Sequence, residues 1–224
     1  MSSVSQNLKS IKEQLPEYVT LVAVSKTQPN EMIMEAYEEG QRIFGENKVQ
    51  ELVDKQENLP KDIQWHMIGH LQRNKVKYIA PFVALIHGVD SLRLLRAINK
   101  EGARNERIIP CLLQMHIASE ETKFGLDENE LFELLESEEF RSFSNVEIHG
   151  LMGMATFTND EEKVASEFRY LKKTFDLIGE KYFETNSAFS VLSMGMSGDY
   201  ETAVAEGSNM VRIGSSIFGE RNYR

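Results

Sequence analysis

The sequence predicts an eight-stranded α/β barrel, a (β/α)8 TIM-type fold, with an extra N-terminal helix. Short apolar runs alternate with longer amphipathic stretches along the 224 residues. Most of the short runs are apolar throughout, which suits strands buried on both faces of a parallel sheet. Eight such strand–helix units with short connections are typical of a closed barrel.

Eight apolar runs are the expected strands. In chain order they are Val19–Val24, Ile43–Phe44, Trp65–Ile68, Leu85–Val89, Ile109–Ile117, Val146–Met152, Phe189–Met194 and Met210–Ile213. An open, doubly wound sheet is the alternative, and it usually carries a glycine-rich turn after its first strand. Here the first strand ends in Ser25-Lys26-Thr27, without glycine. The closed barrel is therefore the better prediction.

Apolar residues at helical spacing predict helices between the strands. The longest such stripe is Val164, Phe168, Leu171, Phe175 and Ile178. Others begin at Leu92, after the plausible N-cap Asp90-Ser91, and within residues 131–135. The stripe of Val4, Leu8, Ile11 and Leu15 predicts a helix before the first strand. No linker-like segment interrupts the series, so we expect one domain over residues 1–224.

Composition excludes several classes of protein. Hydrophobic residues make up 41% and the net charge is −10, so no basic face is expected that could bind nucleic acid. The longest near-apolar run, residues 79–86, is far shorter than the roughly 20 residues of a membrane helix. The N-terminus has no secretory h-region, so a cytoplasmic location is expected. The single cysteine, Cys111, cannot form an internal disulfide.

The histidines do not predict a metal site. His66 and His70 are four residues apart, but no glutamate follows His66 as a zincin helix would require. Their segment also has the pattern of a strand that enters a loop. His87 and His149 lie in apolar strands and are expected to be core histidines.

Lys26 is the most informative residue, because the active site of such a barrel lies at the carboxyl ends of the strands. A lysine that directly follows an apolar strand has its amine partly desolvated, which favours the free amine that attacks a carbonyl. A lysine that snorkels to solvent, or a structural ion pair, is the alternative reading of this residue.

The loops after the last two strands are the customary phosphate site of the fold. Ser197-Gly198 follows the seventh strand, and Gly214-Ser215-Ser216 follows the eighth. Glycine lets backbone N–H groups approach an anion, and serine adds hydroxyl donors. Ordinary connecting turns remain the alternative. Arg212, two residues before Gly214, is a permanent cation, for which a structural salt bridge is the default interpretation.

These residues resemble the YggS/PROSC family of pyridoxal 5′-phosphate (PLP) homeostasis proteins, also called the PLPBP family, over essentially the whole chain. The matching stretches are residues 23–26 (AVSK), 44–47 (FGEN), 65–75 (WHMIGHLQRNK), 150–152 (GLM), 192–199 (LSMGMSGD), 211–214 (VRIG) and 217–219 (IFG). The resemblance implies a PLP-binding barrel similar to the N-terminal domain of alanine racemase.

The resemblance also implies roles for individual residues. Lys26 would form the Schiff base, Arg212 would face the pyridine nitrogen and Asn47 would line the ring pocket. The phosphate would lie against Ser197, Gly214 and Ser215, with His70 and Ser193 as further contacts. One departure is His116, where the family commonly has asparagine. A possible family role for that asparagine therefore does not transfer.

Three functions compete. The resemblance implies a protein that holds PLP and shields it or delivers it to apo PLP-dependent enzymes, with no catalytic residue. We expect this protein to be a monomer. A PLP-dependent amino-acid racemase would need a second base, which alanine racemase takes from a separate domain. The barrel and lysine alone would also allow an aldolase for a phosphorylated sugar. Because Arg212 offers the ring no proton acceptor, the cofactor would be a poor electron sink. We therefore expect the PLP homeostasis function.

Overall fold

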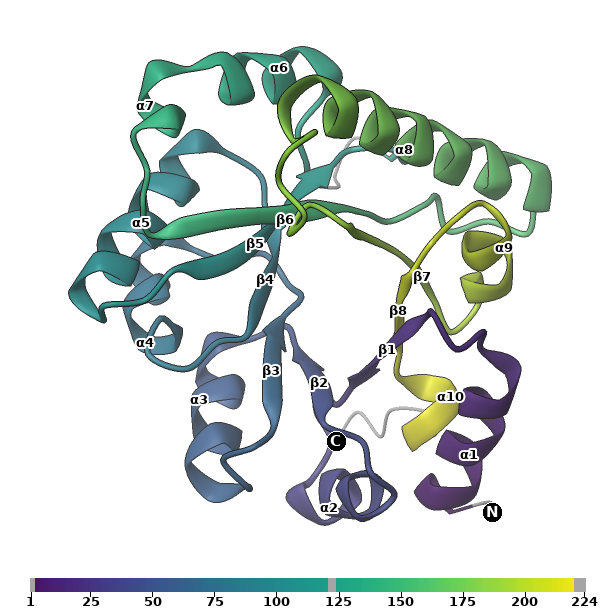
Figure 1. Cartoon of the computed structure of the whole chain (residues 1–224). Helices are drawn as coiled ribbons and strands as arrows, with labels where there is room; N and C mark the ends of the chain where they lie inside the picture. Colours follow the sequence, from purple (N-terminus) through teal and green to yellow (C-terminus); the bar gives the residue numbers. More distant parts are fainter. Residues whose placement is uncertain (1–2, 121–123, 220–224) are drawn as a thin grey trace.

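The structure is a computed structural model that describes residues 3–120 and 124–219. Within these residues, eight parallel strands form a closed barrel in the order of the sequence (Figure 1). The strands are β1 Thr20–Val24, β2 Ile43–Glu46, β3 Gln64–Met67, β4 Leu85–Val89, β5 Ile109–Met115, β6 Val146–Gly153, β7 Val191–Met196 and β8 Met210–Ile213. The predicted fold class is confirmed.

Helices surround the barrel and connect its strands (Figure 1). They are α1 Val4–Gln14, α2 Asn30–Glu38, α3 Val49–Asn58, α4 Val76–Ile79, α5 Leu92–Arg104, α6 Glu128–Glu136, α7 Glu138–Arg141, α8 Glu161–Tyr182, α9 Tyr200–Ala205 and α10 Ser215–Phe218, with a 3-10 turn at Arg73–Lys75. The predicted cap of α5 is confirmed, because the Ser91 side chain accepts a hydrogen bond from the Leu94 N–H. None of the described helices is long and apolar enough to cross a membrane.

The extra N-terminal helix completes the outer ring. Strand β1 closes the barrel by pairing with β8, with Val22 in register with Arg212. Among the described residues, the last strand is followed by the four-residue helix α10, and α1 packs beside α10 and α2 (Figure 1). The Asn7 side chain donates to the Ile217 carbonyl across this contact, at 2.9 Å. Helix α1 therefore covers a region that the short α10 leaves open.

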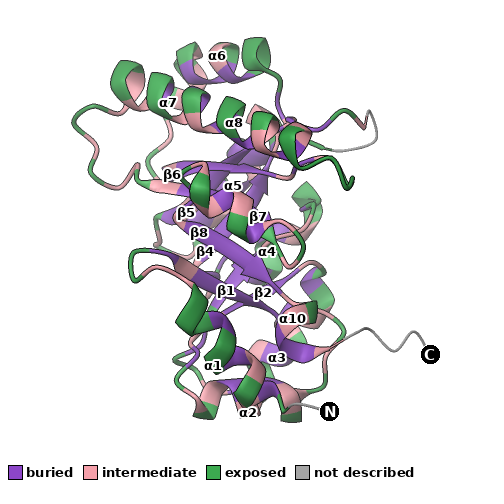
Figure 2. Cartoon of the chain, turned by 90° about the vertical axis from the view of Figure 1, so that its right-hand side faces the viewer, coloured by how far each residue is buried: buried purple, intermediate pink, exposed green. Residues whose placement is uncertain are grey.

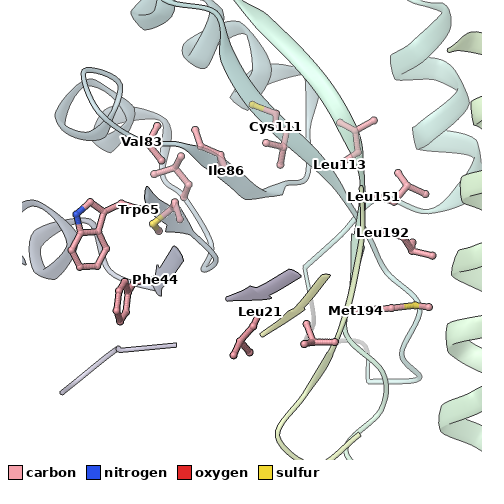
Figure 3. Packing of buried hydrophobic residues seen from close by; sticks show 14 of the residues in the cluster. Leu21, Phe44, Trp65, Val83, Ile86, Cys111, Leu113, Leu151, Leu192 and Met194 are labelled. Carbon is pink, nitrogen blue, oxygen red and sulfur yellow. The ribbon is translucent and has the colours of Figure 1, made fainter. Parts of the chain in front are cut away.

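Two layers of buried side chains fill the fold. The larger layer lies between the strands and the helices, and includes Phe44, Trp65 and Leu113 (Figure 3). The smaller layer contains Val22, Leu85, Leu112, Met152 and Met210. Because successive strand residues point to opposite faces, this second set lies inside the barrel. The strands are accordingly buried along most of their length (Figure 2).

Candidate functional site

Lys26 lies where β1 ends, at the mouth formed by the carboxyl ends of the strands. It is partly buried, and the preceding Ser25 is fully buried. Alternation along β1 places Val22 inside the barrel and Ala23 outside. Ser25 continues the outward set, because its hydroxyl donates to Glu46 Oε1 at 2.6 Å and Glu46 belongs to the outward set of β2. Burial raises the pKa of Glu46 despite the nearby Lys55 ammonium.

Arg212 lies inside the barrel on β8 and is 4% exposed. One guanidinium nitrogen donates to Ser193 Oγ at 2.6 Å, and another donates to the Gly153 carbonyl at 3.0 Å. Burial lowers the pKa of Arg212 to about 10, so the side chain stays a cation at neutral pH. The predicted residues Arg212 and Ser193 are therefore in direct contact.

Two buried histidines extend this contact across the barrel. Ser193 Oγ lies 3.1 Å from His87 Nδ1, and His87 Nε2 lies 3.0 Å from His66 Nδ1. One assignment that satisfies these contacts has the Ser193 hydroxyl accept from Arg212 and donate to His87, which in turn donates to His66. Desolvation lowers the pKa of His66 to about 3 and that of His87 well below its usual value. Both imidazoles are therefore neutral. We call the four hydrogen-bonded residues His66, His87, Ser193 and Arg212 the inner chain.

The two predicted phosphate loops are brought together. The Gly214 N–H donates to Ser197 Oγ at 3.2 Å, so the loop after β7 is joined to the loop after β8. Gly214 also packs against the end of β1, since a Cβ there would lie 3.0 Å from the Val24 carbonyl oxygen. Ser215 begins α10, whose first N–H groups have no partner within the helix. The loops therefore meet two residues before Lys26.

Asn47 lies at the mouth beyond β2. Its Oδ1 atom is buried and has no hydrogen-bond partner among the described residues. Gly69 packs closely on Asn47, because a Cβ on Gly69 would lie 2.5 Å from the Asn47 carbonyl oxygen. A buried acceptor without a partner is costly unless a ligand donates to it. The atom therefore marks a place where a polar ligand group fits.

His70 has a different set of partners. Its Nδ1 lies 3.2 Å from an Asp90 carboxylate oxygen, and its ring stacks on Phe124 with centroids 4.1 Å apart. The side chain is 40% exposed, so the pair lies at the rim of the mouth. His116, the departure from the family pattern, lies with Nε2 3.0 Å from the Glu120 carbonyl oxygen and so contacts the loop after β5.

Sequence reasoning missed two groups of buried polar residues. One consists of Glu46, Glu51 and Lys55; the other is the His66–His87 part of the inner chain. A signal for Lys55 exists, because it takes a position in the apolar stripe that Val49 and Leu52 begin on α3 and that Leu59 continues just after the helix. A lysine on the buried face of a helix indicates a buried partner. Among the described residues, no cluster of three or more histidine, cysteine or acidic side chains could hold a metal.

Comparison with known proteins gives the family. The family model described as "Alanine racemase, N-terminal domain" matches residues 1–222. The pyridoxal phosphate homeostasis protein of Aquifex aeolicus is 41% identical over 204 residues, which cover 91% of this chain and 87% of that protein. The protein of the same name from Escherichia coli K12 is 35% identical, over 100% of this chain and 99% of its own length.

Solved structures agree with these relatives. The structure of PipY from Synechococcus elongatus with PLP bound has a TM-score of 0.87 and 34% identity, over 97% of this chain and 100% of PipY. An alanine racemase of Clostridium difficile shares the fold, with a TM-score of 0.77 at 16% identity; the match covers 98% of this chain and 57% of the racemase. The chain belongs to the pyridoxal phosphate homeostasis proteins, within the alanine racemase N-terminal domain family.

Proposed function

We propose that this chain binds PLP at the barrel mouth and serves intracellular PLP homeostasis by shielding the cofactor and passing it to apo-enzymes. PLP brings an aldehyde that condenses with a primary amine, a phosphate dianion and a basic pyridine nitrogen. In this proposal Lys26 takes the aldehyde, Arg212 faces the pyridine nitrogen, and Asn47 lines the ring. The loop residues Ser197, Gly214 and Ser215 hold the phosphate.

One observation carries the proposal: both glycine–serine loops meet beside the end of β1, two residues before Lys26. The Ser197–Gly214 hydrogen bond joins the loops, and Gly214 touches Val24. A ligand with an anionic group at these loops therefore has an amine within reach of its other end. The family supports PLP as that ligand, because its relatives are named for PLP homeostasis and PipY was solved with PLP bound.

The remaining residues fit the same ligand. The buried Asn47 Oδ1 lacks a donor among the described residues, and a ring hydroxyl would supply one. Arg212 carries donors only, so it can donate to a pyridine nitrogen but cannot accept a proton from a pyridinium. Ser193 is already bonded to Arg212 and His87, so we assign it to positioning Arg212. His70, paired with Asp90, would be a further contact of the cofactor at the rim of the mouth.

Storage and transfer of the cofactor are favoured over racemisation. Racemisation needs a proton acceptor on each face of the reacting carbon, and a positioned base contributes about 10²–10⁴-fold in rate. The match to the alanine racemase of Clostridium difficile covers 57% of that enzyme, so it does not extend over the whole racemase. An arginine beside the pyridine nitrogen also weakens the ring as an electron sink.

An absorbance and trapping experiment tests the site. Addition of PLP to the purified protein should produce a visible absorption band, and borohydride followed by peptide mapping should place the pyridoxyl group on Lys26. Lys26→Ala should lose the band, whereas the exposed neighbour Lys48→Ala should keep it. A pyridoxyl group on Lys48 or Lys75 in the parent protein would refute the assignment.

A second experiment tests the function. The PLP-loaded protein should activate an apo PLP-dependent enzyme while giving no appreciable Cα–H exchange with alanine or serine in deuterated water. Rapid, saturable deuterium incorporation that Lys26→Ala abolishes would instead establish the racemase alternative.

A further inference from the structure

The turn that carries Lys26 has an unfavourable backbone conformation. The Gln28 N–H donates to the Ser25 carbonyl at 3.0 Å, which closes a four-residue turn with Lys26 and Thr27 in its centre. Thr27 has φ +66°, in the left-handed region that non-glycine residues avoid. A β-branched residue there costs about 1–2 kcal/mol. Surrounding contacts must therefore hold the turn in place.

Three charged side chains supply these contacts, and we call Glu46, Glu51 and Lys55 the ionic clamp. Lys55 Nζ donates to the Ser25 carbonyl at 2.8 Å, to Glu46 Oε1 at 2.8 Å and to Glu51 Oε1 at 2.7 Å. Glu51 Oε1 also accepts from the Thr27 N–H at 2.5 Å. The clamp thus binds the backbone on both sides of Lys26.

The clamp lies outside the barrel wall, behind the turn that carries Lys26. The side chains of Lys55 and Glu46 are 4% and 0% exposed, and that of Glu51 is 22% exposed. Lys55 and Glu51 come from α3, which packs outside β2 and β3. Buried ion pairs of this kind are often no more stabilising than apolar side chains of the same volume. Stability alone therefore does not explain the clamp, whereas its contacts with the turn give it a role.

We propose that Glu46, Glu51 and Lys55 are positioning residues that fix the Ser25–Gln28 turn so that the Lys26 amine faces the bound PLP. This proposal rests on the proposed function. The ionic clamp touches neither cofactor nor substrate, and it acts through the backbone of Lys26. Small displacements of a reacting group can slow a reaction by up to about 100-fold. Loosening the turn should therefore slow formation of the covalent Lys26–PLP bond.

Glu51→Ala is the primary test, because it removes the acceptor of the Thr27 N–H and leaves the Glu46–Lys55 pair. We measure the rate at which the visible band appears when PLP is added to protein stripped of cofactor. The rate should fall at least tenfold. Glu57→Ala, which alters an exposed glutamate on the same helix, should keep the parent rate. Glu51→Gln should also stay within about threefold of the parent, since the amide oxygen still accepts from Thr27.

A rescue variant separates positioning from general stability. Glycine adopts positive φ without a steric penalty, so Thr27→Gly should hold the turn without the clamp. Thr27→Gly combined with Glu51→Ala should therefore recover most of the lost rate. Thermal unfolding is followed in parallel. A merely structural role would lower the melting temperature of Glu51→Ala and leave its rate unchanged, or would leave the rate unrescued by Thr27→Gly.

Either of those results would overturn the proposal. A parent protein that forms no bond at Lys26 would give a third, distinct pattern. That pattern would refute the proposed function, and the clamp's role with it.

Discussion

The barrel holds two buried polar regions that are built on opposite principles. The ionic clamp consists of three charged groups outside the wall, and it binds the backbone that carries Lys26. The inner chain lies inside the wall, where two neutral histidines and a serine lead to a single cation, Arg212. The clamp fixes the position of Lys26, whereas the inner chain fixes the charge and direction of the Arg212 side chain.

The cost of burial differs in the same way. In the ionic clamp one lysine is shared by two carboxylates, so removal of the lysine leaves both carboxylates without their cation. In the inner chain the histidines avoid the cost by staying neutral, and Arg212 is bonded to a serine and a backbone carbonyl. Substitutions in each of the two regions test this contrast.

Lys55→Met should be the most destabilising single change. It leaves Glu46 and Glu51 without their cation, and breaking a buried pair in this way costs about 3–5 kcal/mol. Urea unfolding of the purified variant measures the loss. Lys55→Met combined with Glu46→Leu should recover most of the lost stability, because an apolar pair then replaces an ionic one. A Lys55→Met protein as stable as the parent would show that the clamp carries little charge.

The inner chain should dominate the stability of the protein in mild acid. Because the pKa of His66 is lowered to about 3, the unfolded chain takes up a proton below pH 6.5 that the folded chain refuses. The free energy of unfolding should thus be highest above pH 6.5 and fall by about 1.4 kcal/mol per pH unit for each such histidine as the pH drops. His87 should add a similar slope, since its pKa is also lowered.

Urea unfolding between pH 7.5 and pH 5.5 checks this slope. His66→Gln should lower it, because the lowered pKa of His66 is one source of the slope. The ionic clamp contributes with the opposite sign, because the pKa of Glu46 is raised and the folded state holds its proton to higher pH. An unchanged slope in His66→Gln would refute the neutral assignment of the inner chain.

A serine-to-alanine change in each region should separate effects on the position of the Lys26 amine from effects on the charge and orientation of Arg212. Ser193→Ala removes the hydrogen-bond partner that Arg212 and His87 share. Ser25→Ala removes the hydroxyl that donates a hydrogen bond to Glu46. Each should cost about 1–3 kcal/mol of stability. Ser193→Ala should also shift the absorption band of bound PLP, whereas Ser25→Ala should slow its appearance. Identical band shifts in the two variants would contradict the division of roles.

Much of the fold follows from local sequence, because fully apolar strands and regular helical stripes leave a strong pattern. All eight strands were predicted, with errors at their ends. The run from Phe189 was expected to open β7, which begins at Val191. Phe189 instead stacks on Phe175 and Phe183, so a tertiary contact overrides the pattern. The four-residue helices α4, α7 and α10 are too short to show a period.

The candidate site was predictable where strand ends alone place the residues. Lys26, Ser197 and Gly214 follow three strands whose ends meet in any such barrel. The helical pattern indicates that Lys55 is buried, but it does not identify the partners of Lys55, because Lys55 and Glu51 lie on a helix between strands and meet Ser25 only through packing. The inner chain joins β3, β4, β7 and β8, and its hydrogen bonds depend on the register between strands.

The smallest expected effect is the coupling between the two regions. Ser193 and Thr20 both pair with Met210, so they lie at the same level of the sheet. Ser25 is five residues further along β1, which at about 3.3 Å per residue puts it roughly 16 Å away along the strand direction. Sites this far apart with no shared partner usually have additive effects within about 0.5 kcal/mol.

The Ser25→Ala, Ser193→Ala double variant should therefore lose the sum of the two single losses in urea unfolding. Its rate of PLP bond formation should match that of Ser25→Ala, and its band position should match that of Ser193→Ala. The clamp fixes the position of the Lys26 amine, and the inner chain fixes the orientation and charge of the Arg212 guanidinium. Neither change should therefore alter the effect of the other. A coupling energy above about 1 kcal/mol would mean that the barrel wall transmits strain between the regions, and the two roles would then need to be treated as one.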